Sequence, residues 1–174
     1  MDKKALPESE LTEKVKTVLD AEPHLHAGGI AEKLGVSEGE VVFSLPSGMV
    51  TSLPGVHAKA ILESLSEWGP VTTIVASGGS IFEVKAPFPK GVEGHGYYNL
   101  FGKEGEIHGH LRLDRVNRIG LVCKPHRGQE SYFIGFFDKA GLCIFKVYLG
   151  RDEHRQLFPE QVDKFMALKG LVNE

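Results

Sequence analysis

The feature that most constrains the fold is a series of short strand-like segments between residues 70 and 150, with no helical pattern among them. Parallel strands need long crossovers that usually contain a helix, whereas antiparallel strands are joined by tight turns. The segments are rich in β-branched and aromatic residues, and glycine turns such as SGG, GKEG and DKAG separate them. Consecutive strands of this kind predict an antiparallel sheet of meander type. The seven segments read VTTIVA, SIFEVKA, GYYNLF, EIHGHLRL, RIGLVCK, ESYFIGFF and LCIFKVYLG.

Helical patterns flank this strand-rich region on both sides. Residues 8–45 show apolar residues at helical spacing, and Ser37 with Glu40 three positions later is typical of a capping box. Pro159 is well placed to begin a last helix. The predicted fold class is α+β: an N-terminal helical segment, then a mainly antiparallel β-sheet of about seven or more strands with a C-terminal helix. We expect residues 1–45 to form a helical cap, residues 46–174 to form the sheet domain, and the two to pack as one compact unit.

The N-terminal helices resemble a helix-turn-helix, which raises the possibility of DNA binding. A recognition helix carries side chains such as Arg, Asn, Gln or Lys toward base edges. Here the third helix instead offers two serines and the two acids Glu38 and Glu40. The net charge is −3 and the chain has no concentrated basic run. A cap packed on the rest of the protein is the better interpretation, and we expect no nucleic-acid partner.

The remaining composition indicates a cytoplasmic protein. The only two cysteines, Cys123 and Cys143, lie in apolar runs with no zinc or disulfide spacing, which favours buried thiols in a reducing compartment. The first residues contain no apolar signal segment, and no stretch reaches the eighteen apolar residues of a membrane span. We therefore expect no membrane insertion.

The stretch HGYYNLFGKEGEIHGHLR, residues 95–112, holds three of the eight histidines and two of the four tyrosines. A hairpin with a two- or four-residue loop at GKEG pairs Tyr97 with His110, Asn99 with His108, and His95 with Arg112. One face of this predicted hairpin is apolar, with Tyr98, Leu100, Ile107, Leu111 and Leu113. The other gathers groups that bind metals or anions: His95, Tyr97, Asn99, Phe101, His108, His110 and Arg112.

The polar face has three readings. It is an ordinary solvated face, or a zinc site built around the two histidines of HGH, or a platform for a flat, anionic, metal-containing cofactor. Such a cofactor needs one or two axial ligands, aromatic contacts and a cation for its carboxylates. Tyr97 or His110 for the metal, Phe101 for the ring and Arg112 for a carboxylate would meet these needs. The residues alone leave the three readings open.

The blocks HGYYNLFGKEGEIHGHLRLDRVNRIGLV, FFDKAGLCIFKVYLGRDEHRQLFPEQVDKF and WGPVTTIV resemble the ChuX/HutX family of intracellular haem-utilisation proteins. The resemblance extends over about residues 38 to 170. It implies an extended antiparallel sheet with helices on one side, commonly as a homodimer. It also implies a cytoplasmic protein that binds ferric haem b, sequesters it and delivers it to a haem-degrading partner during iron acquisition.

Carried onto this chain, the family's ligand positions fall on Tyr97 and His110. Some members have a histidine where this chain has Ala76, so a ligand scheme that uses that histidine is not available here. The resemblance therefore favours Tyr97 as the ligand, with His110 or His95 as alternate or second ligand. The resemblance implies a carrier and not an enzyme, and no nucleotide loop, nucleophile elbow or HExxH motif is present. A haem-degrading, haem oxygenase-like enzyme is the alternative, ahead of a zinc-binding or a DNA-binding protein.

Overall fold

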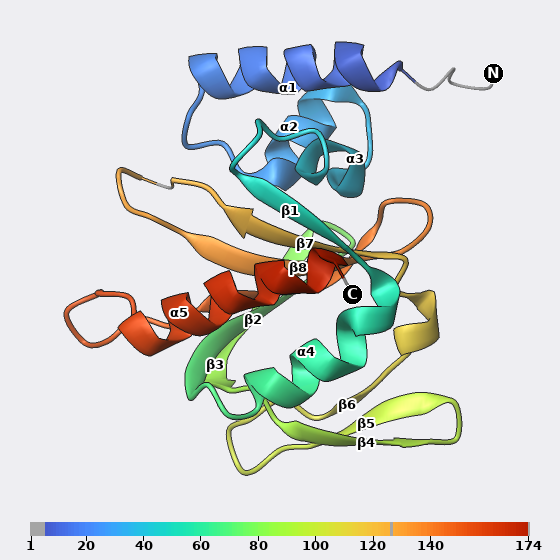
Figure 1. Cartoon of the computed structure of the whole chain (residues 1–174), viewed down its shortest axis with the longest axis vertical. Coiled ribbons are helices and arrows are strands. Elements are labelled where there is room, and N and C mark those ends of the chain that lie inside the picture. Colours follow the sequence, from blue (N-terminus) through green and yellow to red (C-terminus); the bar gives the residue numbers. More distant parts are fainter. Residues whose placement is uncertain (1–5, 126, 174) are drawn as a thin grey trace.

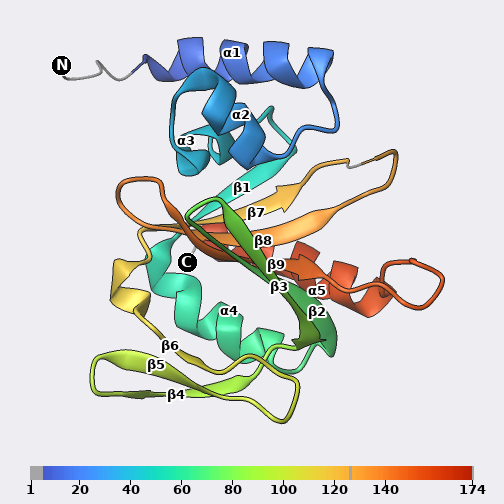
Figure 2. The same cartoon turned by 180° about the vertical axis from the view of Figure 1, so that it is seen from behind.

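The computed structural model describes residues 6–125 and 127–173, and it confirms the α+β fold class. Its strands form two antiparallel sheets (Figures 1 and 2). The larger sheet has the order β1 (Val50–Pro54), β7 (Arg118–Cys123), β8 (Tyr132–Phe137), β9 (Cys143–Leu149), β2 (Pro70–Ser77) and β3 (Ser80–Pro87). The smaller sheet has the order β4 (Lys90–Gly94), β5 (Tyr97–Phe101) and β6 (Gly109–Leu111).

The expectation of a single meander sheet was therefore wrong, because the strands divide between two sheets, whereas the expected count of about seven or more strands is confirmed. Two additional strands, β1 and β4, lie in segments rich in Gly, Pro and polar residues, and both lie at the edge of a sheet, where such residues are tolerated. The chain also leaves the larger sheet after β3, where Pro87 and Pro89 enclose the buried Phe88. Proline cannot donate a ladder hydrogen bond, so this segment separates the two sheets.

Helices cover both faces of the larger sheet. On one face lie α1 (Glu8–Ala21), α2 (Ala27–Leu34) and α3 (Glu38–Val42), which share an apolar cluster with Val122, Phe133 and Phe137. On the other face α4 (Ala58–Leu65) and α5 (Pro159–Leu168) share a second cluster with Ile134 and Phe136. The structure also contains the short 3-10 helices η1 (Gly55–His57), η2 (Leu113–Arg115) and η3 (Lys169–Asn173).

The third helix of the helix-turn-helix-like segment is docked on the sheet. Its capping box is confirmed, because Ser37 Oγ accepts a hydrogen bond from Glu40 N and Glu40 Oε2 accepts one from Ser37 N. Gly39 N donates to Gly141 O at 2.8 Å, and a side chain on Gly39 would collide with the backbone there. Glu38 forms an ion pair with Lys146 of β9. The contacts of this helix are therefore made with the larger sheet, as expected of a cap.

The smaller sheet lies at the end of the molecule opposite α1–α3, with α4 between it and the larger sheet (Figures 1 and 2). Tyr98 and Leu100 of β5 are buried in the core that includes α4. Gly91 of β4 makes this packing possible, because a Cβ there would lie 2.4 Å from Tyr98 Cε1. Lys59 Nζ of α4 forms an ion pair with Glu93 Oε2 of β4 at 2.8 Å, at the edge of the packing between α4 and the smaller sheet. One face of the smaller sheet is thus fixed against the protein.

No helix in the described residues is both long and apolar enough to cross a bilayer.

Candidate functional site

The turn between β4 and β5 places His95 differently from the sequence prediction. His95 and Gly96 both have positive φ values, 54° and 80°, and Gly94 pairs with Tyr97 on either side of them. This is the pattern of a two-residue type I′ hairpin turn. His95 is therefore an exposed turn residue and not a strand residue, and its predicted pairing with Arg112 is wrong.

The register between β5 and β6 also differs from the prediction, by two residues. Asn99 lies opposite His110, Tyr98 opposite Leu111, and Leu100 opposite Gly109, so the predicted pairs of Tyr97 with His110 and of Asn99 with His108 are wrong. The loop spans residues 102–108 and contains a turn in which Glu106 N donates to Lys103 O. It is longer than the loop assumed from GKEG, and it carries His108 outside the strand.

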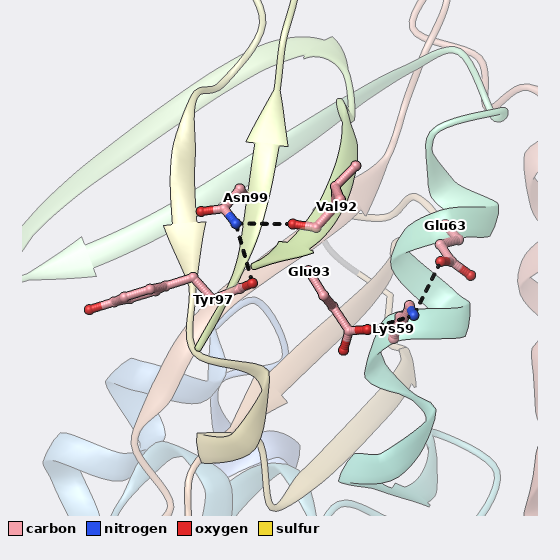
Figure 3. A network of polar contacts seen from close by, with 6 residues as sticks. All are labelled: Lys59, Glu63, Val92, Glu93, Tyr97 and Asn99. Carbon is pink, nitrogen blue, oxygen red and sulfur yellow. Dashed lines mark hydrogen bonds and ion pairs between the residues drawn. The ribbon is translucent and has the colours of Figure 1, made fainter. Parts of the chain in front are cut away.

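A shift by two residues preserves the faces, because side chains alternate along a strand. Tyr98 and Leu100 are buried, whereas Tyr97, Phe101 and His110 are exposed, so the predicted division into an apolar and a polar face is confirmed. Figure 3 shows Glu93 turned toward Lys59 on α4 and the Tyr97 ring turned away from that helix. We call the solvent-facing side the outer face. It consists of Val92, Tyr97, Asn99, Phe101, His110 and Arg112.

The outer face presents an unusual amount of apolar surface to solvent. The side chains of Phe101, Val92 and Tyr97 are 65%, 60% and 40% exposed. Val92 comes from β4, which the sequence analysis did not recognise as a strand, so its contribution was missed. No alternation of apolar and polar residues marks KGVEG as a strand, because two of its five residues are glycine.

Tyr97 and His110 are neighbours across β5 and β6. Their ring centroids lie 5.8 Å apart at an interplanar angle of 68°, an edge-to-face contact. The Arg112 guanidinium carbon lies 5.7 Å from the centroid of the Tyr97 ring. The two potential iron ligands and the potential carboxylate partner therefore lie together on the outer face, whereas His95 remains in the turn.

Asn99 occupies the middle of the outer face and bonds to both neighbouring strands. Its amide nitrogen donates to Val92 O and Gly94 O, both at 3.1 Å, and more weakly to Tyr97 O at 3.4 Å. Figure 3 draws the bonds to Val92 O and Tyr97 O. Its amide oxygen lies 2.7 Å from His110 Nδ1. The sequence placed Asn99 on this face without a role, because a hydrogen bond across strands depends on register.

Arg112 has a partner that the sequence analysis did not name. Its Nε and Nη2 donate to the two carboxylate oxygens of Asp114 at 2.8 and 2.7 Å. The hydrogen bonds and charge of Asp114 raise the pKa of Arg112, and the guanidinium lowers the pKa of Asp114. A carboxylate that approaches Arg112 would therefore meet a guanidinium already bonded through two of its nitrogens.

The chemistry available here is binding through an exposed surface. Within residues 6–125 and 127–173, no three His, Cys, Asp or Glu side chains gather closely enough to enclose a metal ion. The face offers instead one phenol, one imidazole, one guanidinium and apolar rings, which together suit a flat molecule with its own metal and carboxylates.

Comparison with known proteins connects this site to a family. The model of the haem utilisation ChuX/HutX family matches residues 51–168. The intracellular heme transport protein HutX of Vibrio cholerae serotype O1 is 53% identical over 159 residues, which cover 91% of this chain and 82% of that protein.

Solved structures agree with this match. The structure of the heme binding protein ChuX is 35% identical with a TM-score of 0.82, covering 94% of this chain and 99% of that one. ChuS, an E. coli heme oxygenase, is 18% identical with a TM-score of 0.71, covering 87% of this chain and 47% of that one, and this likeness concerns the fold alone. With more than half of its length matched by the family model and a relative of this identity, the chain belongs to the ChuX/HutX family of haem utilisation proteins.

Proposed function

We propose that this protein binds haem on the outer face of the smaller sheet and carries it to another protein. The observation that carries the proposal is the arrangement of Tyr97 and His110 in edge-to-face contact, beside exposed Phe101 and Val92. Large exposed apolar groups on a soluble protein mark binding surfaces. The names of the two relatives, one a heme transport protein and one a heme binding protein, support the same conclusion.

In this proposal Tyr97 is the principal iron ligand and His110 the alternate one. A phenolate is a hard oxygen donor and favours ferric over ferrous iron, which fits ferric haem b. The rings of Tyr97 and His110 touch on the same face of the sheet, so a porphyrin cannot lie between them in this arrangement. The geometry supports one protein ligand on the iron at a time. His95, in the turn, is a weaker candidate.

The remaining groups would bind the rest of the haem. Phe101 and Val92 offer apolar contact to the porphyrin plane, and Arg112 offers a charged hydrogen bond to a propionate. Asp114 already bonds to that guanidinium, so a propionate would have to share or displace it. A propionate that replaced Asp114 would restore the same kind of charged hydrogen bonds to Arg112, which suits a surface that must also release its cargo.

Carriage is favoured over haem degradation by the openness of the site. An oxygenase must retain a reactive intermediate away from water, whereas the outer face is exposed along β4, β5 and β6. The fold shared with a heme oxygenase makes degradation the alternative. Incubation of the ferric complex with an electron donor and dioxygen distinguishes the two: a carrier keeps its haem intact, and an enzyme converts it at a rate that depends on Tyr97 or His110.

We further propose a cytoplasmic protein that passes haem to a haem-degrading acceptor. Residues 46–174 would form the haem-binding domain, since the outer face comes wholly from residues 90–112. Residues 1–45 would act as a cap, and their helices α1–α3 lie at the end far from the smaller sheet (Figure 1). Transfer is tested by mixing the haem complex with a candidate acceptor and following the spectrum of each protein.

A homodimer is proposed from the free edge of the larger sheet. β3 is the last strand on that side among the described residues, and Ile81 and Phe82 on it are 62% and 61% exposed. Antiparallel pairing with a second copy about Val84 would place Glu83 opposite the copy's Lys85, a favourable cross-strand pair. Light scattering should give a dimer mass for the wild type and a monomer mass for Phe82→Glu.

The haem proposal is tested by haemin titration of the wild type, Tyr97→Phe and His110→Ala. Saturation at one haem per chain is expected. In Tyr97→Phe we expect loss of the tyrosinate charge-transfer band and a loss of affinity beyond the roughly 10- to 100-fold typical when a ligand loses only its hydrogen-bond partner. Tyr148→Phe on β9 and His154→Ala in an exposed turn are the matched controls. An unsaturable wild type, or equal losses in the controls, would overturn the proposal.

A further inference from the structure

We propose that Asn99 is a positioning residue that holds His110 in one tautomer, with its Nε2 lone pair free. The proposal deepens the haem-binding function proposed above and rests on it for its purpose. The assignment of the tautomer itself depends only on the hydrogen bonds around Asn99. It therefore names which nitrogen of His110 is offered to iron.

The orientation of the Asn99 amide is fixed by what surrounds its nitrogen. The three atoms near Nδ2 are the carbonyl oxygens of Val92, Gly94 and Tyr97, and a carbonyl oxygen can only accept. If the amide were flipped, its oxygen would face these three oxygens and every bond would be lost. The Oδ1 atom must therefore be the one that faces His110.

This orientation determines where the proton of His110 lies. An amide oxygen cannot donate, so the 2.7 Å contact between Asn99 Oδ1 and His110 Nδ1 requires a hydrogen on Nδ1. A neutral imidazole carries one such hydrogen, and Nε2 then keeps its lone pair. Rotating the ring by half a turn would place a carbon against Oδ1 and lose the bond. The network thus selects both the ring orientation and the tautomer.

The register of the sheet makes this selection rigid. Asn99 is on the central strand, opposite Val92 on one side and His110 on the other, so its amide is held from β4 while it holds β6. Histidine ligands in metalloproteins commonly donate their second N–H to a fixed oxygen, which orients the ring and strengthens the ligand. Asn99 Oδ1 and His110 Nδ1 have the same relation on the outer face. Nδ1 is occupied, and only Nε2 is available.

The test is the tautomer of His110 in the haem-free protein, read from 15N–1H multiple-bond spectra at mildly alkaline pH. His110→Ala identifies the signals. The wild type should show a protonated Nδ1 and a bare Nε2. Asn99→Leu, which removes the acceptor at Nδ1, should shift the ring toward the Nε2–H form. Asn117→Leu, the same change at an exposed asparagine outside the outer face, is the matched control.

A wild type already in the Nε2–H form, or an Asn99→Leu variant with an unchanged tautomer, would overturn the inference. Haemin titration of the same samples tests the proposed function separately. The predicted tautomer in a protein that binds no haem would contradict the function alone. If both hold, Asn99→Leu should weaken the His110-dependent part of binding by roughly 10- to 100-fold. The same change should have no effect in the His110→Ala background.

Discussion

The central strands of the two sheets differ in what covers them. β8 of the larger sheet is buried at all six positions, with α1–α3 on one face and α4 and α5 on the other. β5 of the smaller sheet alternates, with Tyr98 and Leu100 buried and Tyr97 and Phe101 exposed. Both are antiparallel strands with aromatic residues, so residue type does not distinguish them. What differs is that, within residues 6–125 and 127–173, no helix covers the outer face of β5.

The comparison separates the residues that stabilise the fold from those that we expect to bind haem. Apolar side chains that are enclosed on β8 contribute to the free energy of folding, whereas those exposed on β5 contribute little until something covers them. Substitutions in the two sheets should therefore separate into changes in stability and changes in haem affinity.

The largest expected effect is on the larger sheet. Phe136→Ala removes a fully buried ring stacked on Phe145 at 4.4 Å, so we expect a loss of about 3–5 kcal/mol in the free energy of unfolding. Phe101→Ala on the outer face should change that free energy by less than about 0.5 kcal/mol and weaken haemin binding. Urea unfolding and haemin titration of both variants give the measurement. A destabilised Phe101→Ala with normal haem affinity would remove the distinction between the sheets.

A second contrast in stability and haem affinity compares the buried side-chain amide of Gln161 with the exposed one of Gln156. Gln161 of α5 is buried, accepts from Gly150 N and donates to the carbonyls of Trp68 and Pro70, so it joins α5 to the larger sheet. Gln161→Ala would leave buried backbone groups unpaired and should cost about 2–4 kcal/mol, with haem affinity per folded molecule unchanged. Gln156→Ala, at an exposed position, is the control. Weaker haem binding by folded Gln161→Ala would mean that the two sheets are coupled.

At alkaline pH the expected effect on stability is smaller for each pH unit. Burial raises the pKa of the Cys143 thiol on β9 to about 12, from 9.0 in an exposed thiol. An acid with a raised folded pKa stabilises the protein fully below its unfolded pKa, and this contribution is lost as pH rises. Between about pH 9 and 12 the free energy of unfolding should fall by up to about 1.4 kcal/mol per pH unit. The stability curve of Cys143→Ala should lack this component, and that of Cys123→Ala should keep it. Parallel curves for Cys143→Ala and the wild type would show that the thiol is not shielded.

The smallest effect is expected at the salt bridge on the rim of the outer face. Arg112 and Asp114 are both exposed, and exposed ion pairs contribute little to stability. Asp114→Asn should leave the melting temperature unchanged and slightly strengthen haemin binding, because the guanidinium becomes free for a propionate. Glu153→Gln, which alters an exposed carboxylate in another turn, is the control. A weaker affinity in Asp114→Asn would indicate that Asp114 orients Arg112 for haem.

The same comparison explains what the sequence could predict. The alternation in HGYYNLF divided β5 correctly into two faces, because burial on one side imposes a period of two. The capping box at Ser37 and Glu40 was recognisable because it is a local pattern. The register between β5 and β6 was not recognisable, because Glu106 and Lys103 form a turn inside a longer loop and no local pattern gives its length. The roles of Asn99 and Val92 depend on that register or on β4, and were missed with it.

The central claim is that haem binds to the outer face of the smaller sheet and not to the larger sheet. The most direct measurement is an amide chemical-shift map of 15N-labelled protein with gallium protoporphyrin, a diamagnetic analogue of ferric haem. Our account predicts the largest shifts at residues 90–101 and 109–112, with small ones on β7, β8 and β9. Largest shifts on the larger sheet or α5, with the outer face unaffected, would contradict it.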